Sequence, residues 1–300
     1  MAPARFRGAS LDPRTPPLIA KLGMGASRFG AHGTVATRPG PSAAEAFAMM
    51  ALAAEAGVRL IDTAGDAIES ERMLGQVVPR EPGFDIVTKT GHLDQGVEAA
   101  LHHARSSLRR LRVERAHAIL VRPAALLHDP DGPRLWAGLR KLQDQGLYTA
   151  VGISACVCDD PVGLARRYQP DLMQLPVSLL DRRLIANGAL AELSALGVEL
   201  HLRSAFLHGL LFRPSPTAEA PQVSRLRRLL AEAGADPMQA ALAFALGRPE
   251  AAKVIVGVNS PLELRAVLAA ARAPAPALDW AALELDAPPC QLAARRRCAA

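Results

Sequence analysis

The fold is decided by two short runs, Val58-Arg59-Leu60-Ile61-Asp62 and Phe84-Asp85-Ile86-Val87-Thr88-Lys89. Each run is largely apolar, has the length of a strand and ends on a charged residue. In a barrel of parallel strands, side chains at the C-terminal ends of the strands point into the active-site mouth. We therefore predict that Asp62 and Lys89 meet there, within reach of a salt bridge. A buried lysine can titrate and a buried arginine cannot, so a lysine at this position is informative in a chain that is rich in arginine.

Strand-like apolar runs alternate with amphipathic helical stretches along most of the chain. That alternation is typical of βαβ units around a parallel sheet, and eight such strands close a barrel. We predict an α/β fold, a single (β/α)8 TIM barrel over residues 1–300, with an N-terminal arm at 1–17 and a C-terminal tail at 273–300. The expected strands are 18–23, 58–62, 84–89, 116–122, 148–154, 171–175, 198–204 and 253–257. The expected helices are 42–56, 69–79, 97–111, 133–145, 160–168, 182–196, 237–247 and 260–272, with a short one at 279–285.

Capping boxes mark several of the helix starts. In this motif a short side chain accepts a hydrogen bond from a backbone amide three residues on, where a Glu or Gln side chain reaches back. The segment 205–235 is longer than a simple connection after a seventh strand, and it contains a proline-rich piece and then a helical run. We expect this added loop and helix to cover a ligand. The boxes pair Ser42 with Glu45, Asp236 with Gln239 and Ser260 with Glu263.

Composition excludes several classes of function. The chain has 300 residues and a net charge of +6, but its arginines are scattered, without the aromatic interleaving of a nucleic-acid groove. No apolar run reaches the length of a membrane span, and the N-terminus lacks the hydrophobic stretch of a signal peptide. We therefore expect a soluble, unprocessed, cytoplasmic protein with no nucleic-acid or membrane partner.

The four cysteines have no CxxC spacing and no accompanying histidines. Reduced thiols and the absence of a metal site are the expectation, although a redox or metal role for the first two stays open. The cysteines are Cys156, Cys158, Cys290 and Cys298.

Several motifs resemble those of one known family. Leu60-Ile61-Asp62-Thr63-Ala64, followed by Glu71-Arg72-Met73-Leu74-Gly75, is similar to the Asp-Thr-Ala…Glu…Leu-Gly motif of the aldo-keto reductases. Gln174 and the segment Arg203–Leu211 follow in the order of that family, and the resemblance extends over nearly the whole chain. It implies a (β/α)8 barrel that uses NADPH or NADH to reduce carbonyl compounds.

The resemblance also implies a catalytic set of Asp, Tyr, Lys and His, in which the Tyr hydroxyl gives a proton to the carbonyl oxygen. Asp62 and Lys89 match the first and third members. Ala67 stands where the Tyr belongs, and Arg122 stands where the His belongs. General acid catalysis is worth about 10²–10⁴-fold in rate, so the loss of a phenol predicts weak or altered activity.

Other residues could take over part of this chemistry. Arg122 either binds the carboxylate or phosphate of a substrate or pairs with Asp62 or Asp66 in the space left by the tyrosine. His92 and His208 are alternative acids at the mouth, although an isolated loop histidine is more often solvated. The only tyrosines, Tyr148 at a strand start and Tyr168 at a helix end, are expected at the bottom of the barrel, away from the site.

By resemblance, the cofactor is NADP or NAD, and a chain that binds neither remains an alternative. Ser154 and Gln174 occupy positions that hold the nicotinamide amide, and Glu263 lies where an Arg or Gln commonly faces the adenosine. A glutamate beside a 2′-phosphate is repulsive, which favours NADH over NADPH; Glu263 is otherwise only the capping partner of Ser260. The complete expected cofactor set is Gly23, Met24, Gly25, Ser154, Gln174, Ser204, Phe206, His208, Gly209, Gly257, Asn259 and Glu263.

Three functions follow from these residues. The first is a nicotinamide-dependent oxidoreductase that interconverts carbonyls and alcohols with weak or altered activity. The second is a pseudoenzyme that holds a dinucleotide or an anionic metabolite in a binding or regulatory role. A third, non-redox chemistry at Lys89 such as that of a lyase or isomerase, is a weaker alternative. The partner in each case is a small molecule, a carbonyl compound or an anionic metabolite.

Overall fold

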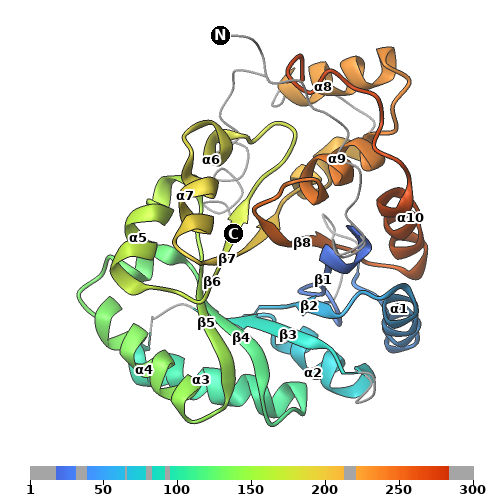
Figure 1. The fold of residues 1–300 in the computed structure, drawn as a ribbon. Coiled ribbons are helices and arrows are strands. Elements are labelled where there is room, and N and C mark those ends of the chain that lie inside the picture. Colours follow the sequence, from blue (N-terminus) through green and yellow to red (C-terminus); the bar gives the residue numbers. More distant parts are fainter. Residues whose placement is uncertain are drawn as a thin grey trace.

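The computed structural model contains eight parallel strands that close into a barrel, as predicted (Figure 1). It describes residues 18–31, 39–64, 66–78, 83–91, 95–212 and 221–283. The strands pair in chain order, and the last pairs with the first. The strands are β1 Leu22–Gly25, β2 Leu60–Asp62, β3 Asp85–Lys89, β4 Ala116–Val121, β5 Tyr148–Ser154, β6 Leu172–Pro176, β7 Glu199–Arg203 and β8 Ala251–Gly257.

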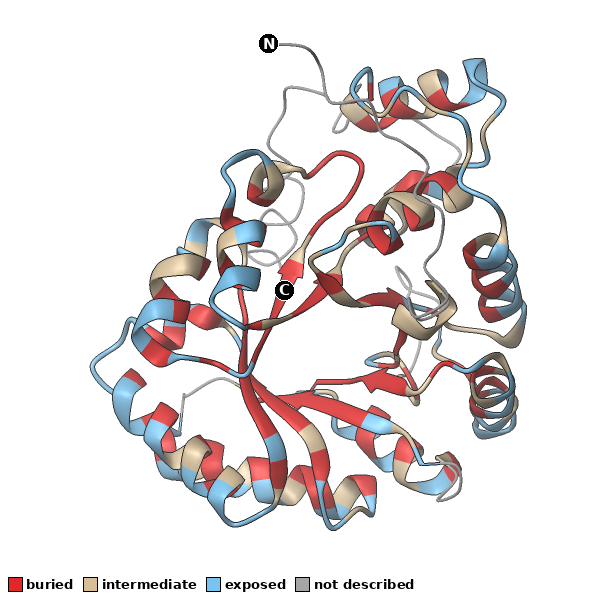
Figure 2. Cartoon of the chain, viewed as in Figure 1, coloured by how far each residue is buried: buried red, intermediate tan, exposed pale blue. Residues whose placement is uncertain are grey.

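Helices surround the strands, and Figure 2 shows the strands buried along most of their length while the helices are buried on one side. The α-helices are α1 Ala43–Ala56, α2 Ile68–Val77, α3 Gly96–Leu111, α4 Gly132–Asp144, α5 Pro161–Tyr168, α6 Arg183–Ala186, α7 Ala189–Ala195, α8 Pro221–Glu232, α9 Pro237–Leu246 and α10 Pro261–Arg272. Short 3₁₀ turns are η1 Leu18–Lys21, η2 Ala124–Leu127, η3 Val157–Asp159 and η4 Leu207–Phe212.

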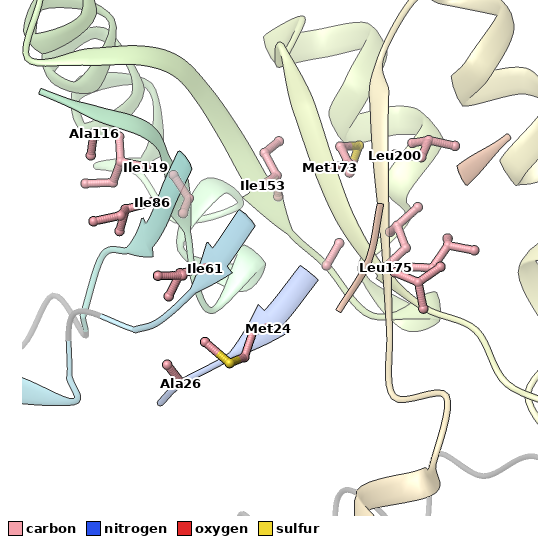
Figure 3. Close-up of a cluster of buried hydrophobic side chains, with 14 of the residues drawn as sticks. Met24, Ala26, Ile61, Ile86, Ala116, Ile119, Ile153, Met173, Leu175 and Leu200 are labelled. Carbon is pink, nitrogen blue, oxygen red and sulfur yellow. The ribbon is translucent and has the colours of Figure 1, made fainter. Parts of the chain in front are cut away.

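Alternate residues of each strand face two different cores, because side chains alternate across a strand. Figure 3 shows outward-facing side chains, among them Ile61, Ile86, Ile119 and Ile153, in the larger core against the helices. A smaller cluster fills the barrel interior, where Gly152 is required: a Cβ there would lie 2.3 Å from the Leu172 carbonyl oxygen. The interior cluster is Leu60, Val87, Ala118, Leu120, Ala150, Leu172 and Ile255.

The predicted element after the seventh strand is present. Between β7 and β8 the chain forms η4, α8 and α9, and these share a separate small core with Leu179 and Leu180 from the loop after β6. The Arg227 guanidinium on α8 donates from Nε to the Leu211 carbonyl at 2.9 Å, which fixes α8 against η4.

Three element predictions were wrong. The first strand begins at Leu22 rather than at residue 18, because residues 18–21 form a 3₁₀ turn held by the Lys253 ammonium, which donates to the Ala20 carbonyl at 2.9 Å. The helix predicted at 182–196 is broken into α6 and α7, since Gly188 adopts a left-handed φ of 75°. Residues 280–283 form a turn instead of a helix, and 284–285 lie outside the described residues.

The capping motifs were confirmed in part. Ser42 and Glu45 form a complete capping box at the start of α1. Asp236 and Ser260 accept hydrogen bonds from the backbone amides of Gln239 and Glu263, as expected. The Glu263 carboxylate, however, accepts from the Asn259 amide at 2.7 Å, one residue before the position that a capping box requires.

Candidate functional site

Asp62 and Lys89 meet at the C-terminal mouth of the barrel, so the salt bridge predicted from the sequence is present. The Lys89 ammonium donates to Asp62 Oδ1 at 2.6 Å and to the Thr63 carbonyl oxygen at 2.6 Å. β2 and β3 are adjacent in the barrel, and each of the two residues ends its strand. Both are buried: Lys89 is 5% exposed and Asp62 is 9% exposed.

Gln174 completes this cluster from the opposite wall of the barrel. Its side-chain amide on β6 donates from Nε2 to Asp62 Oδ1 at 2.7 Å. Its carboxamide oxygen accepts no hydrogen bond from any described residue. Gln174 also pairs in register with Ser154 at the end of β5, so two of the expected cofactor residues lie beside the Asp62–Lys89 pair.

The environment of Lys89 favours loss of its proton. Burial lowers the pKa of Lys89 below its ordinary value, the Asp62 carboxylate raises it in part, and the cations of Arg122 and Arg203 lower it further. A lysine whose pKa is lowered in this way releases its proton more readily than an exposed lysine. That property is expected of a lysine in a proton-transfer site.

No phenol stands at the position where the resemblance to the aldo-keto reductases implies one. Ala67 is the N-cap residue of α2, and its methyl group is partly buried. A cavity of about 260 Å³ adjoins it, lined by residues of the loop after β1 and of the first turn of α2. The lining residues are Ser27, Phe29, Ala31, Asp66, Ala67, Ile68, Glu69 and Ser70.

Of the two roles considered for Arg122, the structure shows the pairing with Asp66. Its guanidinium Nη1 lies 3.8 Å from the Asp66 carboxylate, and it is not paired with Asp62. Both partners are about half exposed, at 44% and 52% of the side chain. Exposed ion pairs contribute roughly 0–1 kcal/mol, so Asp66 holds Arg122 only weakly.

Arg203 is a site residue that the sequence analysis did not single out. It ends β7, and its guanidinium donates from Nη2 to the Ala155 carbonyl at 3.0 Å and lies 3.6 Å from Cys156 Sγ. Arg203 ends β7 at the C-terminal end of the barrel, and its charge, like that of Arg122, lowers the pKa of Lys89. The position of Arg203 at a strand end is the sequence signal that could have identified it, as it identified Asp62 and Lys89.

Neither tyrosine is part of this cluster. The Tyr148 hydroxyl donates to the Ala104 carbonyl at 2.8 Å, and burial raises the pKa of Tyr148. The Tyr168 hydroxyl donates to the Leu127 carbonyl at 2.6 Å, after β4, and its ring packs on Trp136. Tyr168 was expected at the bottom of the barrel, but its hydroxyl reaches a residue that follows the C-terminal end of β4. Side chains on a helix point back toward the start of the helix, which explains this position.

The expected cofactor residues divide into two groups. Gly25 lies level with both Asp62 and Gly257 in the strand register, and Gly257 has open space where a Cβ would be. The Met24 side chain, in contrast, faces the outer core, and Gly23 packs inside the barrel against Leu60 and Ile255, so their place in the expected cofactor set stays a prediction. Alternation along β1 explains this difference, since only Gly25 is the inward-facing residue at the strand end.

The loops after β7 and β8 carry the remaining expected residues. Ser204 adopts a left-handed φ of 68° and Gly209 one of 80°, and the Phe206 ring packs edge-on against Phe212. Asn259 and Glu263 form the start of α10 described above. The side chain of His208, and all of His92, lie outside the described residues.

Other kinds of site were not found in the described part of the chain. No group of three His, Cys, Asp or Glu residues there could hold a metal ion. Cys156 and Cys158 form no disulfide within the same residues, while Cys290 and Cys298 lie beyond them. Over those ranges, no helix combines the length and the apolar character needed to cross a bilayer.

Comparison with known proteins identifies the family of this barrel. The model of the aldo/keto reductase family matches residues 21–285. The chain belongs to the aldo/keto reductase family. This family membership covers the barrel and all of the strand ends that form the mouth.

Individual aldo-keto reductases match only part of the chain. One from Mycolicibacterium vanbaalenii is 35% identical over 137 residues, which is 41% of this chain and 46% of that protein. Another from a Mycobacterium species is 34% identical over 122 residues, 37% of this chain and 40% of that protein. The chain therefore matches less than half the length of these curated relatives.

A solved structure shares the fold of this chain. The holo form of the aldo-keto reductase AKR11C1 from Bacillus halodurans superimposes with a TM-score of 0.73 at 21% identity, covering 89% of this chain and 93% of that one.

Proposed function

We propose that this aldo-keto reductase family protein is a nicotinamide-dependent oxidoreductase that lacks the usual proton donor and interconverts carbonyls and alcohols only weakly. The observation that carries the proposal is the buried Lys89–Asp62–Gln174 cluster, together with a partly buried alanine at position 67. The cluster keeps the Lys and Asp that would lower the pKa of a tyrosine proton donor, while Ala67 stands in place of that tyrosine.

The residues present fit a nicotinamide ring at the mouth. Ser154 is buried at the end of β5, and its hydroxyl makes no hydrogen bond to any described residue. The Gln174 carboxamide oxygen beside it is equally available. A hydroxyl donor and a carbonyl acceptor on adjacent strand ends complement a carboxamide, which is both an acceptor and a donor. A bound nicotinamide cofactor would supply the hydride.

The other residues then act on the carbonyl oxygen. The Lys89 ammonium and the Arg122 guanidinium can polarise that oxygen as negative charge develops on it. A water molecule or His92 would have to supply the proton that the phenol gives elsewhere in the family. Asp62 holds the ammonium in place, and Gln174 links this pair to the cofactor wall.

Cofactor choice follows from the start of α10. A helix N-terminus favours negative charge and is a common phosphate site, but the Glu263 carboxylate already occupies this one through the Asn259 amide. We expect calorimetric titration to show that NADPH binds no more tightly than NADH. Glu263→Gln should improve NADPH binding relative to NADH by about 2–5-fold, because it removes a charge at a helix terminus. A clear preference of the wild type for NADPH would contradict this account.

A second candidate is a binding protein for an anionic metabolite, favoured by the two guanidinium groups at the mouth. Arg122 is held only by an exposed ion pair with Asp66, and Arg203 contacts neutral groups such as the Ala155 carbonyl and the Ser204 hydroxyl. Two cations with one weak carboxylate partner should attract a carboxylate or phosphate.

The measurement for this candidate is thermal stability against added citrate, phosphate and sugar phosphates. We expect a saturable rise in melting temperature that Arg122→Ala reduces and that Arg225→Ala, which removes an exposed charge on α8, leaves intact. Equal stabilisation of wild type and Arg122→Ala would remove Arg122 from the functional account.

A further inference from the structure

A second cationic site lies on the outer wall of the barrel, between α2 and α3. A surface pocket of about 480 Å³ opens there. Its lining contains four arginines and no carboxylate, and it involves none of the strand-end residues of the mouth. The lining residues are Ile68, Arg72, Gln76, Ser106, Arg109, Arg110 and Arg112.

Two of the four guanidinium groups are neutralised by neighbours. Arg72 Nη1 lies 2.5 Å from the Glu69 carboxylate, and Arg110 lies 2.6 Å from Glu71. The Arg109 guanidinium contacts only the neutral Ser106 hydroxyl among the described residues, at 2.6 Å. Arg112 has no ion-pair partner among them. The described part of the pocket therefore carries two uncompensated positive charges, which match a dianion.

Arg110 provides a rigid floor for such an anion. Its side chain is only 15% exposed, and its guanidinium is fixed by Glu71, by the Ser107 hydroxyl at 3.0 Å and by the His103 ring at 3.1 Å. Glu71 is itself fully buried and accepts a hydrogen bond from Thr88 at 2.7 Å. Nη1 of Arg110 keeps no hydrogen-bond partner among the described residues. A preorganised guanidinium with a free N–H loses little entropy when it binds an oxyanion.

The helix packing holds the pocket in shape. A Cβ at Gly75 would lie 2.1 Å from the Arg110 carbonyl oxygen, so α2 and α3 approach each other as closely as backbones allow. Ile68 begins α2, Arg112 follows the end of α3, and the two helices run in the same direction. Ile68, with 39% of its surface exposed, thus places an apolar patch at the end of the pocket opposite Arg112.

From these observations we infer that the pocket between α2 and α3 binds a phosphate monoester, with the phosphate held by Arg109, Arg110 and Arg112 and an apolar substituent against Ile68. Planar guanidinium groups bind phosphate oxygens through paired hydrogen bonds, which a single lysine cannot do. Two uncompensated charges fit the phosphate dianion, and the exposed isoleucine fits an organic group rather than free phosphate alone. This pocket shares Ile68 with the cavity beside Ala67 and contains none of the strand-end residues of the mouth.

The test is calorimetric titration of the whole chain with phenyl phosphate and with inorganic phosphate, near physiological ionic strength to screen diffuse attraction. We expect saturable binding of both probes, tighter for phenyl phosphate. Arg109→Gln with Arg112→Gln should weaken both by about tenfold or more, since each removes hydrogen bonds to a charged group. Ile68→Ser should weaken phenyl phosphate alone. Arg105→Gln with Arg225→Gln, which removes the same charge elsewhere, should bind like wild type. Arg122→Ala, which alters the mouth, should keep the binding event that Arg109→Gln with Arg112→Gln removes.

Several outcomes would overturn the inference. Unchanged binding by the Arg109/Arg112 variant would show that the pocket is not the site, and an equal loss in the Arg105/Arg225 control would show diffuse electrostatic attraction. Loss of binding in Arg122→Ala would move the site to the mouth. Unchanged phenyl phosphate affinity in Ile68→Ser would remove the apolar subsite. Circular dichroism melts of each variant confirm that these exposed substitutions leave the fold intact.

Discussion

Ala67→Tyr should raise carbonyl reductase activity by about 10²–10⁴-fold, the usual contribution of a positioned general acid. The structure offers the new phenol a place, because a cavity of about 260 Å³ adjoins Ala67. A phenol that reaches the Lys89 ammonium beside Asp62 would be stabilised as a phenolate, which lowers the pKa of the added tyrosine. The measurement is kcat with a simple aldehyde at saturating NADH and at saturating NADPH.

Matched variants separate the hydroxyl from the ring. Ala67→Phe fills the same cavity without a proton to give, so it should remain as slow as wild type. Ala67→Tyr with Arg122→His restores both family positions and should be at least as active as the single variant. If Ala67→Tyr and Ala67→Phe are equally slow while both bind the cofactor, the rest of the machinery is not intact and the proposed function is wrong.

Asp62→Asn should destabilise the fold by about 3–5 kcal/mol, the cost of leaving one member of a buried ion pair without its partner. The variant leaves the Lys89 ammonium buried, held by the Thr63 carbonyl and no carboxylate. Urea unfolding of wild type and variant at neutral pH measures the difference. A loss below about 1 kcal/mol would show that Asp62 contributes little more than an exposed ion pair.

The loss should depend on pH in a definite direction. Asp62 is the group that raises the pKa of Lys89 against the effect of burial, so its removal lowers that pKa further. Between this lowered pKa and the ordinary value near 10.5, the unfolded chain binds more protons than the folded one, and stability rises with pH. Asp62→Asn should therefore recover stability as the solution becomes alkaline. Adding Lys89→Met removes the buried charge and should abolish that recovery.

The barrel could be predicted from the sequence because the same short strand–helix pattern recurs along the chain. Each strand is a short apolar run followed by an amphipathic helix, and the strand ends fix which side chains point into the mouth. That rule placed Asp62 and Lys89 together before any coordinates. It failed at Leu18–Lys21, where the deciding interaction is a hydrogen bond from Lys253, more than two hundred residues away in sequence. No local pattern carries a contact of that kind.

The site was predicted less completely than the fold. Gln174 was expected as a cofactor residue, but its bond to Asp62 depends on two strands on opposite sides of the barrel. The face of β1 on which Met24 lies was not predicted, because a one-residue step along a strand reverses the face. Arg203 belongs to a motif that the sequence analysis quoted, but no role was predicted for it. Its charge acts on the pKa of Lys89, which lies on a different strand. In each case the missing information was the position of a side chain relative to a distant strand.

The most direct test of the account is the turnover number of the wild-type protein itself, measured with a panel of neutral and carboxylate-bearing aldehydes at saturating NADH and NADPH. The account predicts cofactor binding together with a kcat well below ~1 s⁻¹, because Ala67 has no proton to give. Turnover within the usual enzyme range of ~1–10³ s⁻¹ would contradict it, since another group would then be acting as the proton donor.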